Sequence, residues 1–152
     1  MKNKVLIYFV LLISLVGNLK VHSQAIFDEK LGECNIEKFI VESNSAKVEI
    51  EGKDLLTILA ENWDDKIANK IRGILSLQIL VNTQGTSCLL SLENDTNFES
   101  SVLNLGQMLQ ENLKWQCPTE NISVIYSINF YDGEVDIKRV GMDSKKGFVV
   151  ID

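Results

Sequence analysis

The chain has 152 residues, which is enough for one ordinary domain and too few for two. Hydrophobic residues make up 45% and charged residues 24%, a composition that is typical of a folded protein and excludes a disordered chain. The formal net charge of −6 argues against binding to nucleic acid or to an anionic membrane surface, because both need a basic protein face.

Residues 1–23 have the pattern of a secretory signal peptide. Lys2 and Lys4 precede an almost wholly apolar run, and Val21-His22-Ser23 resembles the end of a cleavage site. The run has about a dozen residues, whereas a membrane span needs roughly 20. We therefore expect a protein that is periplasmic or secreted after cleavage and that meets the membrane only through its leader. The alternative is an inner-membrane protein anchored by residues 5–19.

Cleavage would change the chemistry that is available to the protein. Removing residues 1–23 takes away three lysines and the only histidine, so the net charge moves from −6 to −9. Histidine is the commonest general base and metal ligand, and the exported chain would have none. The carboxylates of Asp64-Asp65 and of Asp132-Gly133-Glu134-x-Asp136 lie at predicted turns, where carboxylates are normally solvated. We therefore expect no enzyme activity, no metal site and no cofactor.

Three cysteines remain in the exported chain: Cys34, Cys88 and Cys117. Export permits disulfides, but three cysteines cannot all pair within one chain. The sequence leaves the pairing open. One disulfide with one buried thiol is the plainest outcome, three buried reduced thiols come second, and a metal site is remote because no two cysteines are close in sequence.

Residues 24–53 are expected to be an N-terminal extension that is partly structured. Phe39–Val41 and Val48–Ile50 predict short extended pieces within it. Asp54 then predicts the start of a helix, with its side chain as the cap. Apolar residues at helical spacing continue from there to Trp63.

Alternating strands and a second helix follow this first helix. Ile71 to Val81 alternates and predicts a half-buried antiparallel strand, which ends in an Asn82-Thr83-Gln84-Gly85 hairpin turn. The return strand then places Cys88, Leu90 and Leu92 on one face.

An amphipathic pattern from Phe98 to Leu113 predicts a helix that covers the sheet. A third alternating strand runs from Ile122 to Phe130. Asp132-Gly133 is a strong hairpin signal, so residues 134–140 could return as a fourth strand. The predicted fold class is α+β, a small antiparallel sheet of three to four strands with two helices on one face. This domain would span residues 54–140, followed by a C-terminal tail or short strand over 141–152.

The order of these elements resembles the C-terminal domain of the TonB family. The resemblance rests on three stretches: Leu55-x-x-Ile58-Leu59-Ala60-Glu61-Asn62-Trp63, then Ile71-x-Gly73 with the strand to Val81 and Gly85, then Lys114-Trp115-x-x-Pro118 before a strand ending in Asn129-Phe130. It covers residues 54–130, about half of the chain. It implies a periplasmic protein of a Gram-negative bacterium. Such a protein would bind another envelope protein and would be linked to transmembrane transport at the outer membrane.

Energy transducers of that family hold a segment of an outer-membrane transporter as an added strand beside the last sheet strand. The resemblance therefore implies a partner-binding edge in the third strand, formed by Ile122, Ser123, Val124, Ile125, Tyr126, Ser127, Ile128, Asn129 and Phe130. The Asp132-Gly133 turn favours covering of this edge by residues 134–140. The short extension over 24–53 favours a stand-alone domain over a complete transducer.

A second function remains open at this point. A small secreted inhibitor or toxin-neutralising protein would also be acidic and would also lack catalytic residues. Both functions depend on binding another protein, and the sequence does not identify that protein.

Overall fold

The computed structural model describes residues 25–31, 34–36 and 38–151, so the predicted signal peptide lies outside the described residues. The strands are β1 (Glu29–Lys30), β2 (Ile40–Val41), β3 (Ile50–Glu51), β4 (Gly73–Val81), β5 (Ser87–Thr96), β6 (Lys114–Trp115), β7 (Ile122–Tyr131), β8 (Glu134–Asp143) and β9 (Gly147–Ile151). The helices are α2 (Leu55–Asn62), α3 (Asp65–Lys70), α4 (Ser100–Leu103) and α5 (Leu105–Asn112).

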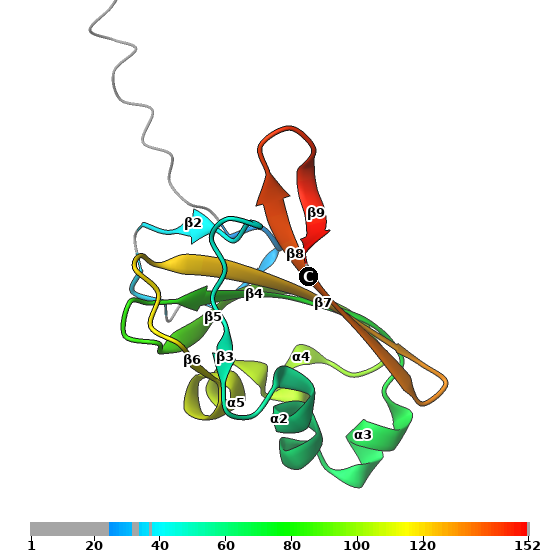
Figure 1. Cartoon of the computed structure of the whole chain (residues 1–152). Coiled ribbons are helices and arrows are strands. Elements are labelled where there is room, and N and C mark those ends of the chain that lie inside the picture. The colour runs from blue at the N-terminus through cyan, green and yellow to red at the C-terminus, as the bar shows by residue number, and fades with distance from the viewer. Residues whose placement is uncertain (1–24, 32–33, 37, 152) are drawn as a thin grey trace, which may run out of the picture.

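Within the described part of the chain, seven strands form one sheet in the order β1-β5-β4-β7-β8-β9, with β2 paired to β7. All of these pairs are antiparallel except β2 with β7. Strands β3 and β6 form a separate small sheet. Figure 1 shows the helices on one side of the large sheet and the β8–β9 hairpin standing out at its edge.

The expected fold, a sheet of three to four strands with two packed helices, is wrong. The chain is built mostly of antiparallel strands, and its helices are only four to eight residues long. The short extended pieces predicted over Phe39–Val41 and Val48–Ile50 overlap β2 and β3, whereas β1 was not predicted. A two-residue strand has no measurable alternation, so periodicity did not indicate how these strands pair. Residues counted as an N-terminal extension therefore supply strands to the sheet itself.

The hydrophobic core lies between the helices and one face of the sheet. Leu75 and Leu77 from β4 and Ile128 from β7 are fully buried on this face, because alternate residues of a strand point the same way. Ile58 from α2 and Leu109 from α5 cover them. Fully burying such a side chain stabilises the fold by about 1.5–3 kcal/mol. The Asp54 cap that the sequence predicted is confirmed, since its Oδ1 accepts the Thr57 backbone N–H at 2.8 Å.

The helix predicted from Phe98 to Leu113 is in fact two helices. Asn104 adopts a left-handed conformation with φ 47° and ψ 40°, which ends α4 before α5 begins. Asparagine tolerates this conformation better than most residues because its short polar side chain can bond locally. The amphipathic pattern is therefore divided between two short helices, and the Val102 side chain in α4 is 50% exposed.

Strand β5 departs from simple alternation at a β-bulge. Its register with β4 shifts at one point, where Leu90 is the extra residue. As a result Leu89 and Leu92 both lie in the hydrophobic core, although three positions separate them. Cys88 pairs with a β4 residue of the opposite face. The expectation that Cys88, Leu90 and Leu92 share one face is therefore wrong.

Cys88 is bonded to Cys34, with a Cα–Cα distance of 5.7 Å. This disulfide joins the N-terminal segment to the face of the sheet that lies away from the helices. Cys117 is free and exposed, so the expectation of a buried leftover thiol is wrong. The pairing brings together residues 54 positions apart, which no local pattern could indicate.

The N-terminal segment also closes a row of buried polar side chains on that far face. Gln78 accepts a hydrogen bond from the Ser91 hydroxyl at 2.7 Å and donates one to the Ser123 hydroxyl at 3.1 Å. The backbone N–H of Ile26 donates to the Gln78 side-chain oxygen at 2.8 Å. Buried polar groups need such partners. Residues 25–31 therefore supply a hydrogen bond to the buried Gln78 side chain as well as covering this face of the sheet.

Candidate functional site

Strand β7 contains the nine residues Ile122 to Phe130 that the family resemblance implied as a partner-binding edge. In the structure it is an interior strand. β4 pairs along one side of it from Ile122 to Phe130, and β8 pairs along the other side from Ile125 to Tyr131. β2 pairs with Ile122 and Ser123 on that second side. The expected covering by residues 134–140 is confirmed, and the backbone groups that an added strand would need are already used.

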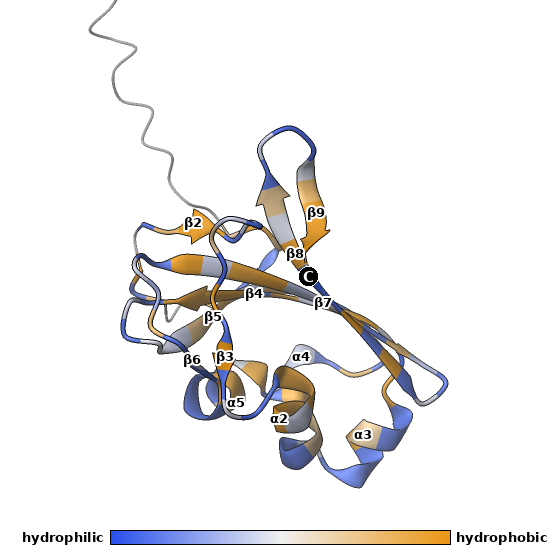
Figure 2. Ribbon diagram, viewed as in Figure 1, coloured by the Kyte–Doolittle hydropathy of each residue, from blue (hydrophilic) through white to orange (hydrophobic). Residues whose placement is uncertain are grey.

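The order of the described sheet ends at β1 and β9, and these two end strands differ in character. β2 also has only one partner strand, β7, and β9 pairs with only the Arg139–Asp143 part of β8. β1 is two residues long, and both Glu29 and Lys30 are charged and exposed. Short, charged strands are a usual way to protect a sheet edge from unwanted pairing. β9 is five residues long, and its Phe148 and Val150 are 51% and 58% exposed. Figure 2 shows β9 as a hydrophobic strand at the free edge of the molecule.

The turn before β9 is built to fold this strand back along β8. Asp143 Oδ1 accepts the backbone N–H groups of Lys145 and Lys146, both at 2.9 Å. Gly147 has φ 78°, a left-handed value that glycine adopts without steric cost. The resulting register places Phe148 opposite Met142, which is 36% exposed. Met142, Phe148 and Val150 together are called the edge patch below.

A buried polar cluster fixes the base of the β8–β9 hairpin. Arg139 on β8 donates to both carboxylate oxygens of Glu42, which directly follows β2 and is fully buried. Arg139 also donates to the Val48 carbonyl, and the Val48 N–H donates to Glu42 Oε1 at 2.9 Å. The guanidinium lies 5.7 Å from the Trp115 ring centroid and 5.8 Å from that of Tyr126. Such cation–π contacts strengthen when they are shielded from water.

Close backbone packing holds β8 against this cluster. The Met142 N–H donates to the Glu42 carbonyl at 2.6 Å. A Cβ atom at Gly141 would lie 2.7 Å from the same carbonyl oxygen, so only glycine fits there. The hairpin therefore leaves the sheet in a fixed direction, and the edge patch has a rigid support.

Burial shifts the pKa values of two side chains in this cluster, Glu42 and Tyr126. Burial raises the pKa of the Glu42 carboxyl above its usual range, although the hydrogen bonds from Arg139 oppose that shift. Burial also raises the pKa of Tyr126 to about 12, against the nearby Arg139 charge. Tyr126 therefore keeps its proton at neutral pH. None of these groups lines the cavity described next, so a substrate has no route to them through it.

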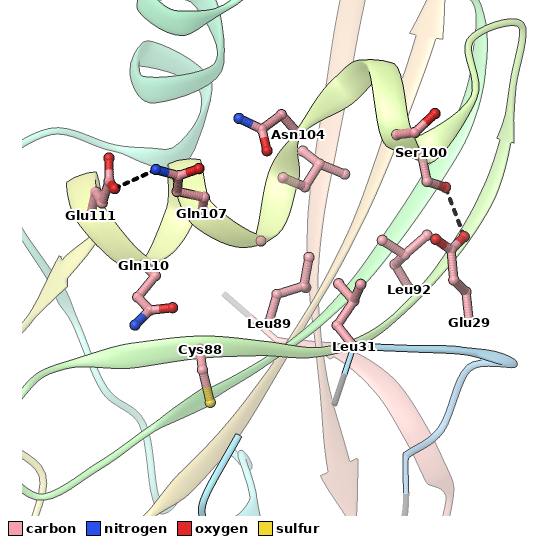
Figure 3. Close-up of a pocket in the computed structure, with 13 residues that line it drawn as sticks. Glu29, Leu31, Cys88, Leu89, Leu92, Ser100, Asn104, Gln107, Gln110 and Glu111 are labelled. Carbon is pink, nitrogen blue, oxygen red and sulfur yellow. Dashed lines mark hydrogen bonds between the residues drawn. The ribbon is translucent and has the colours of Figure 1, made fainter. Parts of the chain in front are cut away.

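A cavity of about 650 Å³ lies between α5 and the β1–β5 side of the sheet (Figure 3). Four leucines line it: the partly exposed Leu31 and the buried Leu89, Leu92 and Leu105. The last three are at most 3% exposed, so a ligand that covered them would remove little apolar surface from water. The Ser100 hydroxyl already donates a hydrogen bond to the Glu29 carboxylate at 2.7 Å, and the Gln107 side-chain amide donates one to the Glu111 carboxylate at 2.8 Å. The cavity therefore offers a ligand less exposed apolar surface than the β9 edge does, and several of its polar side chains are already hydrogen-bonded.

The carboxylates that the sequence singled out have local roles in the structure. Asp64 caps α3 by accepting the Ile67 N–H at 2.8 Å. Asp132 lies in the β7–β8 turn and is 4.0 Å from the Arg72 guanidinium. In the described ranges, no three His, Cys, Asp or Glu side chains are placed to hold a metal ion. The helices of that same part of the chain are all too short or too polar to cross a membrane.

Comparison with known protein families, with curated proteins and with solved structures found no match to this chain. The resemblance to the TonB C-terminal domain therefore stays a prediction, as does the periplasmic location that accompanies it. The edge patch did not emerge from the sequence as a binding site, because Gly147–Ile151 reads equally well as a strand that packs into the core.

Proposed function

We propose that the chain is an exported protein-binding domain that binds an extended segment of another envelope protein along β9. The observation that carries this proposal is the contrast between β1 and β9, the two end strands of the sheet. β1 has the short, charged form of a protected edge, whereas β9 exposes about half of Phe148 and of Val150. In strand addition, the edge backbone supplies hydrogen bonds and the alternate side chains supply specificity.

The energetics favour a modest affinity. Covering a half-exposed Phe or Val side chain contributes roughly 1 kcal/mol, and each added backbone hydrogen bond about 0.5–1.5 kcal/mol. Lost translational and rotational freedom opposes these gains. A five-residue strand therefore supports binding on the order of micromolar, which suits a reversible interaction.

A matched pair of double variants tests the proposal. Phe148→Lys with Val150→Lys places two charges on the edge patch. Ile74→Lys with Val102→Lys makes the same change at residues that are 45% and 50% exposed elsewhere. The exported chain and both variants are immobilised and exposed to an envelope extract of a Gram-negative bacterium. We expect specific proteins to be retained by the wild type and by the control variant, and to be lost from the edge variant.

Urea unfolding of both variants provides the control for folding. Equal retention by the edge and control variants would place the binding surface elsewhere. Failure of the wild type to retain any protein above the background of the bare support would contradict a protein-binding function.

A further inference from the structure

The chemistry of β9 is nearly symmetric about its central residue. Val149 lies between Phe148 and Val150, and these two apolar side chains are exposed on the same face of the hairpin. A strand of this kind can pair with a copy of itself around a twofold axis at Val149. Each Phe148 would then lie opposite a Val150 of the second copy, an aromatic–β-branched pair that stabilises antiparallel strands.

The neighbouring strand extends this complementarity. In the β8–β9 register, Phe148 pairs with Met142, and Val150 pairs with Val140. Twofold pairing of β9 would therefore create two apolar rows across the joined sheets. Each row would contain Val140 and Val150 of one copy, then Phe148 and Met142 of the other. No charged residue would interrupt either row.

The charges at the ends of β9 also agree with this pairing. Lys145 and Lys146 precede the strand, so the lysines of two antiparallel copies lie at opposite ends of the joined strands and do not face each other. Like charges at facing positions would oppose the pairing, and this register avoids them.

We propose that, in the absence of a partner, β9 pairs antiparallel with β9 of a second copy, so that the two large sheets join into one. This inference rests on the proposed function in identifying β9 as the binding edge, and it adds what covers that edge in the free protein. Two five-residue strands bury less than the roughly 1,200 Å² typical of stable interfaces, so the dimer is weak and a partner strand can displace it.

The first test measures mass as a function of concentration. We expect sedimentation equilibrium of the exported chain to show a reversible monomer–dimer equilibrium. Phe148→Lys with Val150→Lys should leave only monomer, and Ile74→Lys with Val102→Lys should dimerise like the wild type. A wild type that stays monomeric throughout overturns the inference, and so does an edge variant that still dimerises. A monomer that still captures envelope proteins through β9 leaves the proposed function intact.

The second test reads the register. In a Cys117→Ser background, Val149→Cys places two thiols across the proposed twofold axis, whereas Val150→Cys places each thiol opposite Phe148 of the other copy. Mild oxidation should convert Val149→Cys to a covalent dimer at least about ten times faster than Val150→Cys, because facing Cβ atoms lie within disulfide reach. Equal rates for the two variants would overturn the proposed pairing. A dimer that crosslinks only at Val149 but captures no other protein would instead contradict the proposed function.

Discussion

At the scale of single residues, the Glu42–Arg139 ion pair differs from the other pairs in its burial. Lys53–Glu61 and Lys138–Asp136 are pairs of half-exposed side chains, whereas Glu42 is fully buried and the Arg139 side chain is 15% exposed. Exposed pairs contribute about 0–1 kcal/mol because water and salt screen them. A buried pair is different, since removing one partner leaves the other charge buried without compensation.

Glu42→Ala should therefore lower the free energy of unfolding by about 3–5 kcal/mol. It leaves the Arg139 guanidinium without its carboxylate partner between the Trp115 and Tyr126 rings. Urea unfolding of the variant and the wild type measures the difference. Glu61→Ala serves as the control and should change stability by less than about 1 kcal/mol, because its pair with Lys53 is exposed. Similar losses in the two variants would contradict a stabilising role for the cluster.

At the scale of elements, the N-terminal segment is an integral part of the sheet rather than an extension of it. β1 pairs with β5, β2 pairs with β7, and the Cys34–Cys88 disulfide fixes the chain between them. The bulge in β5 makes this possible, because it turns Cys88 to the face that the N-terminal segment crosses. A disulfide that closes a long loop stabilises mainly by restricting the unfolded chain.

Replacing both Cys34 and Cys88 by Ser should reduce the free energy of unfolding by about 2–4 kcal/mol, given the separation of 54 residues. Denaturant unfolding under non-reducing conditions gives this value. Cys117→Ser is the matched control and should have little effect, since that thiol is exposed and unpaired in the described structure. A loss of less than about 1 kcal/mol in the double variant would show that β1 and the Gln78 hydrogen bonds hold the segment without the disulfide.

At the scale of the whole molecule, strand order decides which surface can bind a partner. β7, the strand that the TonB resemblance implied as the binding edge, lies inside the sheet between β4 and β8. β9, a short strand at the end of the described chain, takes the outer position. Interior strands need global unfolding to exchange their amide hydrogens, whereas an edge strand exchanges through smaller openings.

Amide hydrogen exchange should therefore depend on protein concentration in β9 but not in β7. Amides of β7 should be strongly protected at every concentration, because partners within the chain occupy both sides of the strand. Amides of β9 that point away from β8 should exchange fast in dilute solution and slowly in concentrated solution, where the proposed dimer covers them. The other β9 amides already pair with β8. Mass-spectrometric exchange over a concentration series measures both strands together. Protection of β9 that does not change with concentration would contradict an open edge in the monomer.

Local chemistry made several elements predictable from the sequence. The Asp54 cap, the Asn82–Gly85 turn and the Asp132-Gly133 turn depend on residues within a few positions of each other. The alternation in β4 and β7 is equally local. Each of these features can be stated without knowing how distant parts of the chain meet.

The remaining features were decided by tertiary structure, because they depend on pairs of residues far apart in the chain. Glu42 meets Arg139 across 97 positions, and Ile40 pairs with Ile122 although β2 is too short to show any period. The bulge at Leu90 appears only when β5 is aligned with β4. Whether a strand is an edge is likewise a property of its neighbours, and its own residues do not specify it. The sequence by itself therefore determined the turns, caps and main strands, whereas only strand order determined that β9 is an end strand with exposed apolar side chains.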